Sequence, residues 1–217
     1  MYYGNRSISF INRESLIVYF VVIVLGIFLV SRKSNRWKRF VLITAAGFIG
    51  MVLEIILILL YQNTNGILFR DIGLLLTAFM VGLSLGAFIV NKLFETLKNK
   101  TNSRRFIGIL LATVFSLLNI IVYLFIKVDL MNNLFIISSM LLFDGICVAG
   151  IFSFTSLNNV ENQQTIISLL YAADLIGGGL GSIIASLILI PVYGLLTSTL
   201  FIAALAVCGT ILIIYSS

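Results

Sequence analysis

Histidine is absent from all 217 residues of the chain. Its absence excludes histidine-ligated haem, histidine-ligated zinc and a Ser-His-Asp triad. Cysteine is nearly as scarce, because Cys147 and Cys208 lie in separate apolar segments with no C-x-x-C pair. Such cysteines are typical of core packing and not of a redox or metal site. We therefore expect a protein that is not an enzyme and that carries neither a metal nor a cofactor.

Charged residues are also few. They make up 10% of the chain, against 60% hydrophobic residues and a mean hydropathy of +1.16. A soluble fold of this composition would have too little polar surface. The sequence therefore predicts an all-α integral membrane protein, since in lipid each apolar segment must satisfy its backbone hydrogen bonds internally. No polar stretch is long enough for a separate soluble domain, so residues 1–217 are expected to form a single transmembrane domain.

Apolar segments long enough to cross a bilayer, at about 20 residues each, recur along the whole chain. The first of them resembles the core of a signal peptide, but it lacks a small-residue cleavage site and precedes its positive cluster. We therefore expect it to be retained. The sequence thus predicts a bundle of about seven transmembrane helices, at residues 15–31, 40–62, 69–91, 106–127, 133–154, 166–190 and 195–216.

Positive charge is concentrated in two loops. Residues 32–39 carry five Lys or Arg side chains, and residues 91–105 carry another five, whereas the alternate loops are poor in them. Because Lys and Arg are enriched in the cytoplasmic loops of membrane proteins, both basic loops are expected to be cytoplasmic. This predicts an N-out/C-in protein of the cell (cytoplasmic) membrane. The net charge of +6 is thereby explained by topology and contact with lipid headgroups, and we expect no binding to nucleic acid.

Small residues form a stripe along residues 166–190. Helical spacing of four places two adjacent rows on one face, which lets a second helix approach closely in a membrane. Backbone flexibility for gating is the alternative interpretation of its glycines. The rows are Ala173, Gly177, Gly181 and Ala185, and beside them Asp174, Gly178, Ser182 and Ser186.

Three carboxylic acids lie deep within the predicted spans: Glu54, Asp144 and Asp174. No Lys or Arg occurs at a matching depth, although an ionised side chain there costs about 2.5–3.5 kcal/mol. Two interpretations remain. The acids are protonated and hydrogen-bonded to backbone or hydroxyl groups, or they face a hydrated cavity that accepts a cation or proton. From the residues alone, both interpretations stay open for each of the three acids.

Two blocks of the sequence, GFIGMVLEIILILLYQNTNGILFRDIGLLLTAFMVGLSLGAFI and YAADLIGGGLGSIIASLILIPVYGLL, contain recurring motifs. Together they resemble the membrane-embedded part of spermidine synthase-like proteins, in which a transporter-like helical region is fused to an aminopropyltransferase-type domain. The resemblance covers residues 40–212. It is carried by Gly47, Phe48, Met51 and Glu54, by Tyr61, Gln62 and Gly66, by Phe79, Met80, Gly82, Leu83 and Gly86, and by Tyr171, Ala172, Asp174, Gly177, Gly181, Pro191 and Gly194.

The resemblance and the buried acids together imply a transporter-like module that binds a cation, a proton or a cationic amine such as a polyamine. Glu54 and Asp174 are the main candidate ligand residues, with Asp144, Gln62 and Tyr171 beside them. The candidate helix-packing residues are Gly82, Gly86, Gly177, Gly178 and Gly181.

Some features depart from this resemblance. Ile67 follows Gly66 where an aromatic residue is usual, and we expect no aminopropyltransferase domain in this chain. Aminopropyl transfer is therefore not expected. The alternative function is a non-catalytic membrane subunit whose acids fix helix packing for a partner protein. Because seven spans are fewer than a two-lobed transporter uses, either function favours a homodimer or a separate partner subunit within the bilayer.

Overall fold

The computed structural model describes residues 35–66, 69–96, 101–128, 133–157 and 163–216. Within these ranges the chain is almost entirely helical and has no strand, which confirms the all-α class. The predicted segment 15–31 lies outside the described residues. The helices are α2 (Asn35–Asn65), α3 (Phe69–Thr96), α4 (Thr101–Lys127), α5 (Leu134–Leu157), α6 (Gln163–Ile184), the π-helix η2 (Ala185–Tyr193) and α7 (Gly194–Ser216).

Five helical stretches in the described part of the chain are long and apolar enough to cross a membrane. They are compatible with a multi-pass membrane protein. The count of seven is not supported, because the predicted segments 166–190 and 195–216 fall in one run of 45 residues. The stretches are Arg39–Asn65, Phe69–Thr96, Phe106–Lys127, Leu134–Leu157 and Ile167–Ile211.

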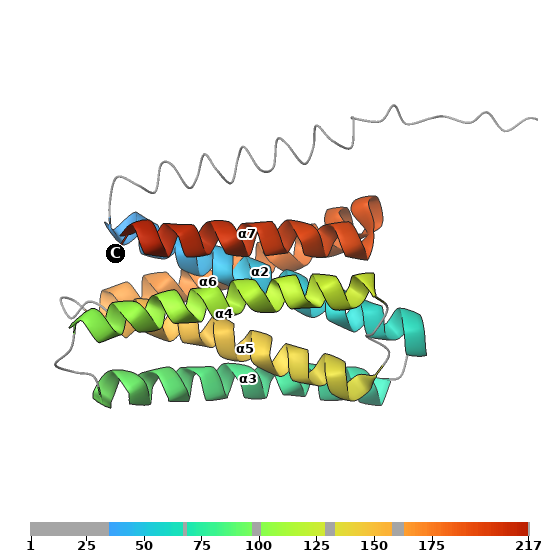
Figure 1. The fold of residues 1–217 in the computed structure, drawn as a ribbon, viewed down its shortest axis with the longest axis horizontal. Coiled ribbons are helices and arrows are strands. Elements are labelled where there is room, and N and C mark those ends of the chain that lie inside the picture. Colours follow the sequence, from blue (N-terminus) through green and yellow to red (C-terminus); the bar gives the residue numbers. More distant parts are fainter. Residues whose placement is uncertain (1–34, 67–68, 97–100, 129–132, 158–162, 217) are drawn as a thin grey trace, which may run out of the picture.

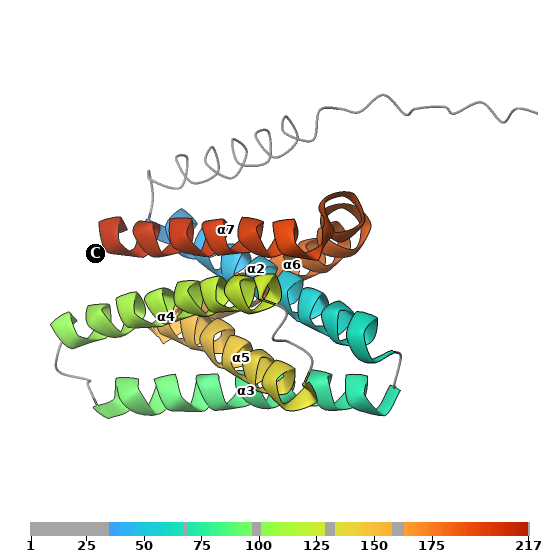
Figure 2. The same ribbon diagram turned by 45° about the vertical axis from the view of Figure 1, so that its right-hand side comes forward.

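The last stretch turns back on itself without a loop. Fully extended as a helix, it would measure roughly 68 Å at about 1.5 Å per residue, more than twice a hydrocarbon core of about 30 Å. Pro191 lies inside η2, and Gly194 follows it with φ 79°, a conformation that favours glycine. The chain therefore turns at Pro191 and Gly194 while it stays helical. As a result, α6 and α7 run in opposite directions (Figure 1, Figure 2).

The bundle is built from three closely packed helix pairs: α3 with α5, α2 with α6, and α4 with α7. Helix α2 also contacts α5 and α7, so it lies at the centre of the bundle. Its residues Val52, Leu53, Ile56 and Leu57 are completely buried. Helix α3 lies at the edge (Figure 1), and its outer face of exposed apolar side chains, such as Phe88, suits contact with lipid.

Glycines bring α6 against the backbone of α2. Gly177 lies against the carbonyl oxygen of Thr44, and a Cβ added at Gly181 would lie 2.7 Å from the carbonyl oxygen of Phe48. In return, a Cβ at Gly47 of α2 would lie 2.8 Å from the carbonyl oxygen of Asp174. These distances are too short for a side chain, so only glycine permits this approach.

The α3–α5 pair is packed in the same way. Gly82 and Gly86 lie against the carbonyl oxygens of Leu142 and Ile146 in α5. In return, a Cβ added at Gly145 would lie 2.5 Å from the carbonyl oxygen of Phe79 and 2.8 Å from the amide nitrogen of Leu83. Both pairs therefore hold their backbones in direct contact, which is where packing energy between membrane helices is found.

Candidate functional site

Asp144 lies in the middle of α5 and is fully enclosed by the bundle. Its exposed fraction is 0%, and among the described residues neither carboxyl oxygen has a hydrogen-bond partner. The Oδ2 atom is directed to α2, since a Cβ added at Gly50 would lie 3.7 Å from it. Buried polar groups are nearly always hydrogen-bonded, because leaving them without a partner costs their whole desolvation energy. A bound proton or cation would therefore lower the energetic cost of burying this carboxyl group.

Glu54 of α2 supplies a second carboxyl group at this place. It follows Gly50 by one turn on the same helix face and is only 4% exposed. Gly50 faces Asp144 Oδ2, so Glu54 lies about one turn of α2 from that carboxyl group. Two neighbouring carboxylates in the bilayer would disfavour the doubly ionised state, because like charges repel and no basic side chain in the described helices lies at this depth. The pair can hold one shared proton, or it can ionise around a cation.

Compensating charge for this carboxyl pair is not found among the described residues. The ion pair present in that part of the chain joins Arg70 to Asp71 at the start of α3. The described residues also contain no group of three or more His, Cys, Asp or Glu side chains that could hold a metal ion. Divalent cations such as calcium take six to eight oxygen ligands. Two carboxyl groups without further acids fit a proton or a monovalent cation better.

Asp174 of α6 lies against α2 about two helical turns away from Glu54. A Cβ added at Gly47 would lie 2.6 Å from Asp174 Oδ1, so this half-buried carboxyl group rests on that glycine. Gly47 and Glu54 are separated by two turns, or roughly 10 Å of rise along α2. Glu54 thus lies one turn from the glycine that faces Asp144 and two turns from the glycine that faces Asp174, the acid with which it was predicted to act.

Gln62 and Tyr171 lie away from the carboxyl pair. Gln62 is half-buried near the end of α2, two turns beyond Glu54. Tyr171 is 57% exposed on the outer side of α6. Its ring therefore faces the surroundings of the bundle, where a tyrosine suits the membrane interface. Neither side chain lies beside Asp144 in this structure.

A polar contact that was not predicted from the sequence joins the ends of α2 and α3. The hydroxyl group of Tyr61 donates a hydrogen bond of 2.6 Å to Asp71 Oδ2, and Arg70 Nε donates one of 3.2 Å to Oδ1. Tyr61 and Asp71 are buried, whereas the Arg70 side chain is 86% exposed. Asp71 also lies in the first turn of α3, where the helix dipole favours a negative charge. The contact anchors the α2–α3 turn, and the adjacent Arg-Asp pair was its signal in the sequence.

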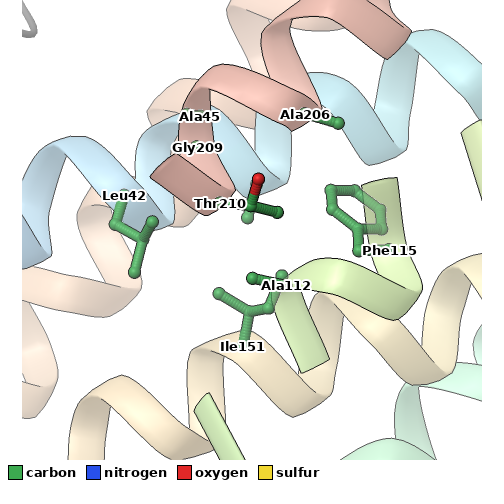
Figure 3. A pocket seen from close by; sticks show the side chains of 9 residues that line it. Leu42, Ala45, Ala112, Phe115, Ile151, Ala206, Gly209 and Thr210 are labelled. Carbon is green, nitrogen blue, oxygen red and sulfur yellow. The ribbon is translucent and has the colours of Figure 1, made fainter. Parts of the chain in front are cut away.

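A small cavity of about 20 Å³ lies where α2, α4, α5 and α7 meet (Figure 3). Thr210 is its polar contributor, and the hydroxyl group of Thr210 is already bonded to the carbonyl oxygen of Val207. A void of this size has room for about one water molecule, which needs two to four polar partners. The cavity is therefore a packing defect and not a ligand site. Its lining residues are Leu42, Ala45, Ala46, Ala112, Phe115, Ile151, Ala206, Gly209 and Thr210.

Comparison of the chain with known proteins finds no relative. No family model matches the chain, and neither a curated protein nor a solved structure matches it. The resemblance to spermidine synthase-like membrane regions therefore remains a prediction. The carboxyl pair at Glu54 and Asp144 is the feature of the bundle on which a function can be argued.

Proposed function

We propose that the chain is a transporter-like module of a multi-pass membrane protein and that the carboxyl groups of Glu54 and Asp144 bind its ligand. The observation that carries this proposal is the enclosed Asp144 side chain, whose two oxygens lack hydrogen-bond partners among the described residues. A buried group of this kind persists in a membrane protein when it serves a proton or ion.

The chemistry of the site favours a proton or a monovalent cation as the ligand. An ionised carboxyl group within the bilayer costs about 2.5–3.5 kcal/mol, and a bound cation offsets this cost by direct attraction. A proton does so by removing the charge. A polyamine, which the resemblance suggests, is the third class of ligand to be tested. Asp174 lies on α6, where its carboxyl group contacts Gly47 of α2, and it serves as the control acid outside the carboxyl pair.

The binding test compares matched acid variants of the purified protein. Thermal unfolding in detergent is followed with Na⁺, K⁺ or spermidine across a pH series, for the wild type, Glu54→Gln, Asp144→Asn and the control Asp174→Asn. A ligand that binds the folded state raises the midpoint of unfolding. We expect Glu54→Gln and Asp144→Asn to lose this shift and Asp174→Asn to keep it.

The expected pH dependence follows from the charge of the pair. As the pH falls, the carboxyl groups gain protons and lose their attraction for a cation, so the cation-induced shift should disappear in acid. If no cation stabilises the protein, proton release measured on unfolding identifies a proton site, since protons held by the pair are given up to solvent. Wild-type and Asp144→Asn protein that behave alike in both measurements would refute the proposal.

A second candidate is the structural subunit, in which the acids serve helix packing. The contact of Asp174 with Gly47 favours this function, because it places a carboxyl group directly in a backbone contact between α2 and α6. In that case Asp174→Asn and Asp144→Asn should both leave unfolding nearly unchanged at every pH. A partner protein should then co-purify with the chain, and its binding should depend on the lipid-facing surface.

The proposed module lies in the cell membrane with its N-terminus outside and its C-terminus inside. A cysteine placed at exposed Asn63, near the end of α2, should then react with a membrane-impermeant maleimide in intact cells. A cysteine at exposed Thr96, at the end of α3, should react only after the membrane is opened. The reverse pattern would invert the topology.

A further inference from the structure

The glycine contacts of α3 with α5 repeat those of α6 with α2. In each pair, two glycines four residues apart face two carbonyl oxygens of the other helix, and one glycine of that helix faces back. Helix α6 thus takes the place of α3, and α2 takes the place of α5. The corresponding positions are Gly82 and Gly177, Gly86 and Gly181, Gly145 and Gly47, Leu142 and Thr44, and Ile146 and Phe48.

The correspondence continues along the helices in both sequence and burial. The segment GLSLG at residues 82–86 matches GGGLG at residues 177–181. Residues 46–50 of α2 and 144–148 of α5 have the same order of buried and half-buried positions. Further buried residues that coincide are Leu75 and Leu170 in α3 and α6, Val90 and Ala185, and Phe94 and Leu189 in α3 and η2, and Ala112 and Ala206, and Ser116 and Thr210 in α4 and α7.

The packing of the helices has the same two-fold relation. If α2, α3 and α4 correspond to α5, α6 and α7, the α2–α6 pair maps onto α5–α3, and the α4–α5 contact maps onto α7–α2. The α2–α5 and α4–α7 contacts map onto themselves. Corresponding helices run in opposite directions (Figure 1, Figure 2), so the two halves of the bundle are inverted relative to each other.

The two-fold axis passes between two equivalent positions of the central helices. Gly50 and Val148 are equivalent, because residues 46–50 of α2 correspond to residues 144–148 of α5. They are also in contact, since a Cβ added at Gly50 would lie 2.6 Å from Val148 Cγ2. Glu54 lies one turn from Gly50, and Asp144 lies one turn from Val148, on the same side of this crossing. The carboxyl pair is therefore located beside the axis, between the two halves.

We propose that α2–α4 and α5–α7 are inverted repeats, and that the repeats exchange conformations to open the Glu54–Asp144 site to each side of the membrane in turn. This inference rests on the proposed function, because it assigns a route to the ligand of that site. Inverted repeats related by an axis in the membrane plane place the site of many secondary transporters at the midplane, between two gates. The exchange requires each repeat to adopt the conformation of the other.

The two acids occur on only one side of the axis. The position equivalent to Glu54 is Phe152, and the position equivalent to Asp144 is Ala46. The repeats therefore share one ligand site for each chain, displaced by one turn from the crossing of α2 and α5. Opening of the two ends must be mutually exclusive, since the same carboxyl pair serves both.

Distances between spin labels at the two ends of α2 and α5 test the exchange. One labelled pair replaces Leu59 and Phe135 with cysteine, and the second replaces their equivalents Leu157 and Trp37, all at half-buried or exposed positions. Cys147 and Cys208 are first replaced by alanine, and each protein is checked for wild-type elution and binding. Double electron–electron resonance is then recorded with Na⁺, with K⁺ and across the pH series.

We expect the two pairs to change in opposite directions, so that one distance lengthens as the other shortens. In the Asp144→Asn background the distances should stop responding to Na⁺ and pH. A fixed distance in both pairs, or a change of both in the same direction, would overturn the exchange. Fixed distances with intact ligand binding would refute the exchange alone, whereas absent binding in the acid-variant test would refute the carboxyl site itself.

Discussion

Replacement of Gly181 by leucine is expected to separate α6 from α2. A Cβ at this position would lie 2.7 Å from the carbonyl oxygen of Phe48 and 3.1 Å from its Cα atom. Ordinary contact begins at about 3.4 Å, and both atoms belong to the backbone of a helix. They cannot rotate away as the end of a side chain could. The helices must therefore move apart by roughly 1 Å or bend locally.

The cost of this movement follows from the length of the contact. A gap of about 0.5–1 Å removes roughly a quarter to a half of the dispersion energy of each atom pair that it separates. The contacts of Gly177 with Thr44 and of Gly47 with Asp174 lie in the same interface and would be opened as well. Overpacking typically costs about 1–3 kcal/mol, and we expect Gly181→Leu to fall at the upper end of that range.

Gly179 offers a matched control in the same helix. A Cβ added there meets no atom within 4 Å, so leucine at this position points into open space. Because glycine is less favourable in a helix than alanine by about 0.8–1 kcal/mol and leucine ranks close to alanine, Gly179→Leu should be neutral or stabilising. The same chemical change, two residues apart, is thus expected to have opposite signs.

The assay is unfolding of the purified variants in mixed micelles as the fraction of denaturing detergent is raised. The difference in free energy of unfolding between the two leucine variants should exceed about 2 kcal/mol, the sum of the two effects. If Gly181→Leu does not fold, Gly181→Ala and Gly179→Ala give the smaller version of the comparison. Equal stabilities of each matched pair would show that the Gly181 face does not contact α2.

Two further predictions concern the ends of the helices. Tyr61→Phe removes the hydrogen bond to buried Asp71 and should lower the free energy of unfolding by about 1–3 kcal/mol, whereas Tyr171→Phe at an exposed position should change it little. Gly194→Ala forces a side chain into φ 79° and should cost about 1–3 kcal/mol, with Gly209→Ala, in the interior of α7, neutral or slightly stabilising. The same micelle titration measures both, and losses no larger than those of the controls would contradict them.

The sequence by itself determined the class of the protein and the position of most helices. The predicted segment 106–127 coincides with the apolar stretch Phe106–Lys127, and the segment 69–91 starts with α3 at Phe69. Both follow from local properties, because composition and length decide whether a segment can span a bilayer. Helical periodicity also predicted the small face of α6 and the start of η2, whose row Ala173, Gly177, Gly181 and Ala185 is buried.

Only the tertiary structure decided which of these faces meet. Glu54, Asp144 and Asp174 are alike in sequence, since each is a lone acid within an apolar helix. Yet Asp144 faces Gly50, one turn from Glu54, whereas Asp174 rests on Gly47. Periodicity assigns a residue to a face of its own helix, but the partner helix and its register depend on packing between distant segments. The turn at Gly194 lies in the predicted break between residues 166–190 and 195–216, where Pro191 and Gly194 signal it locally. The two-fold relation of the helix pairs was hidden, because it is a property of how helices pack and no single segment encodes it.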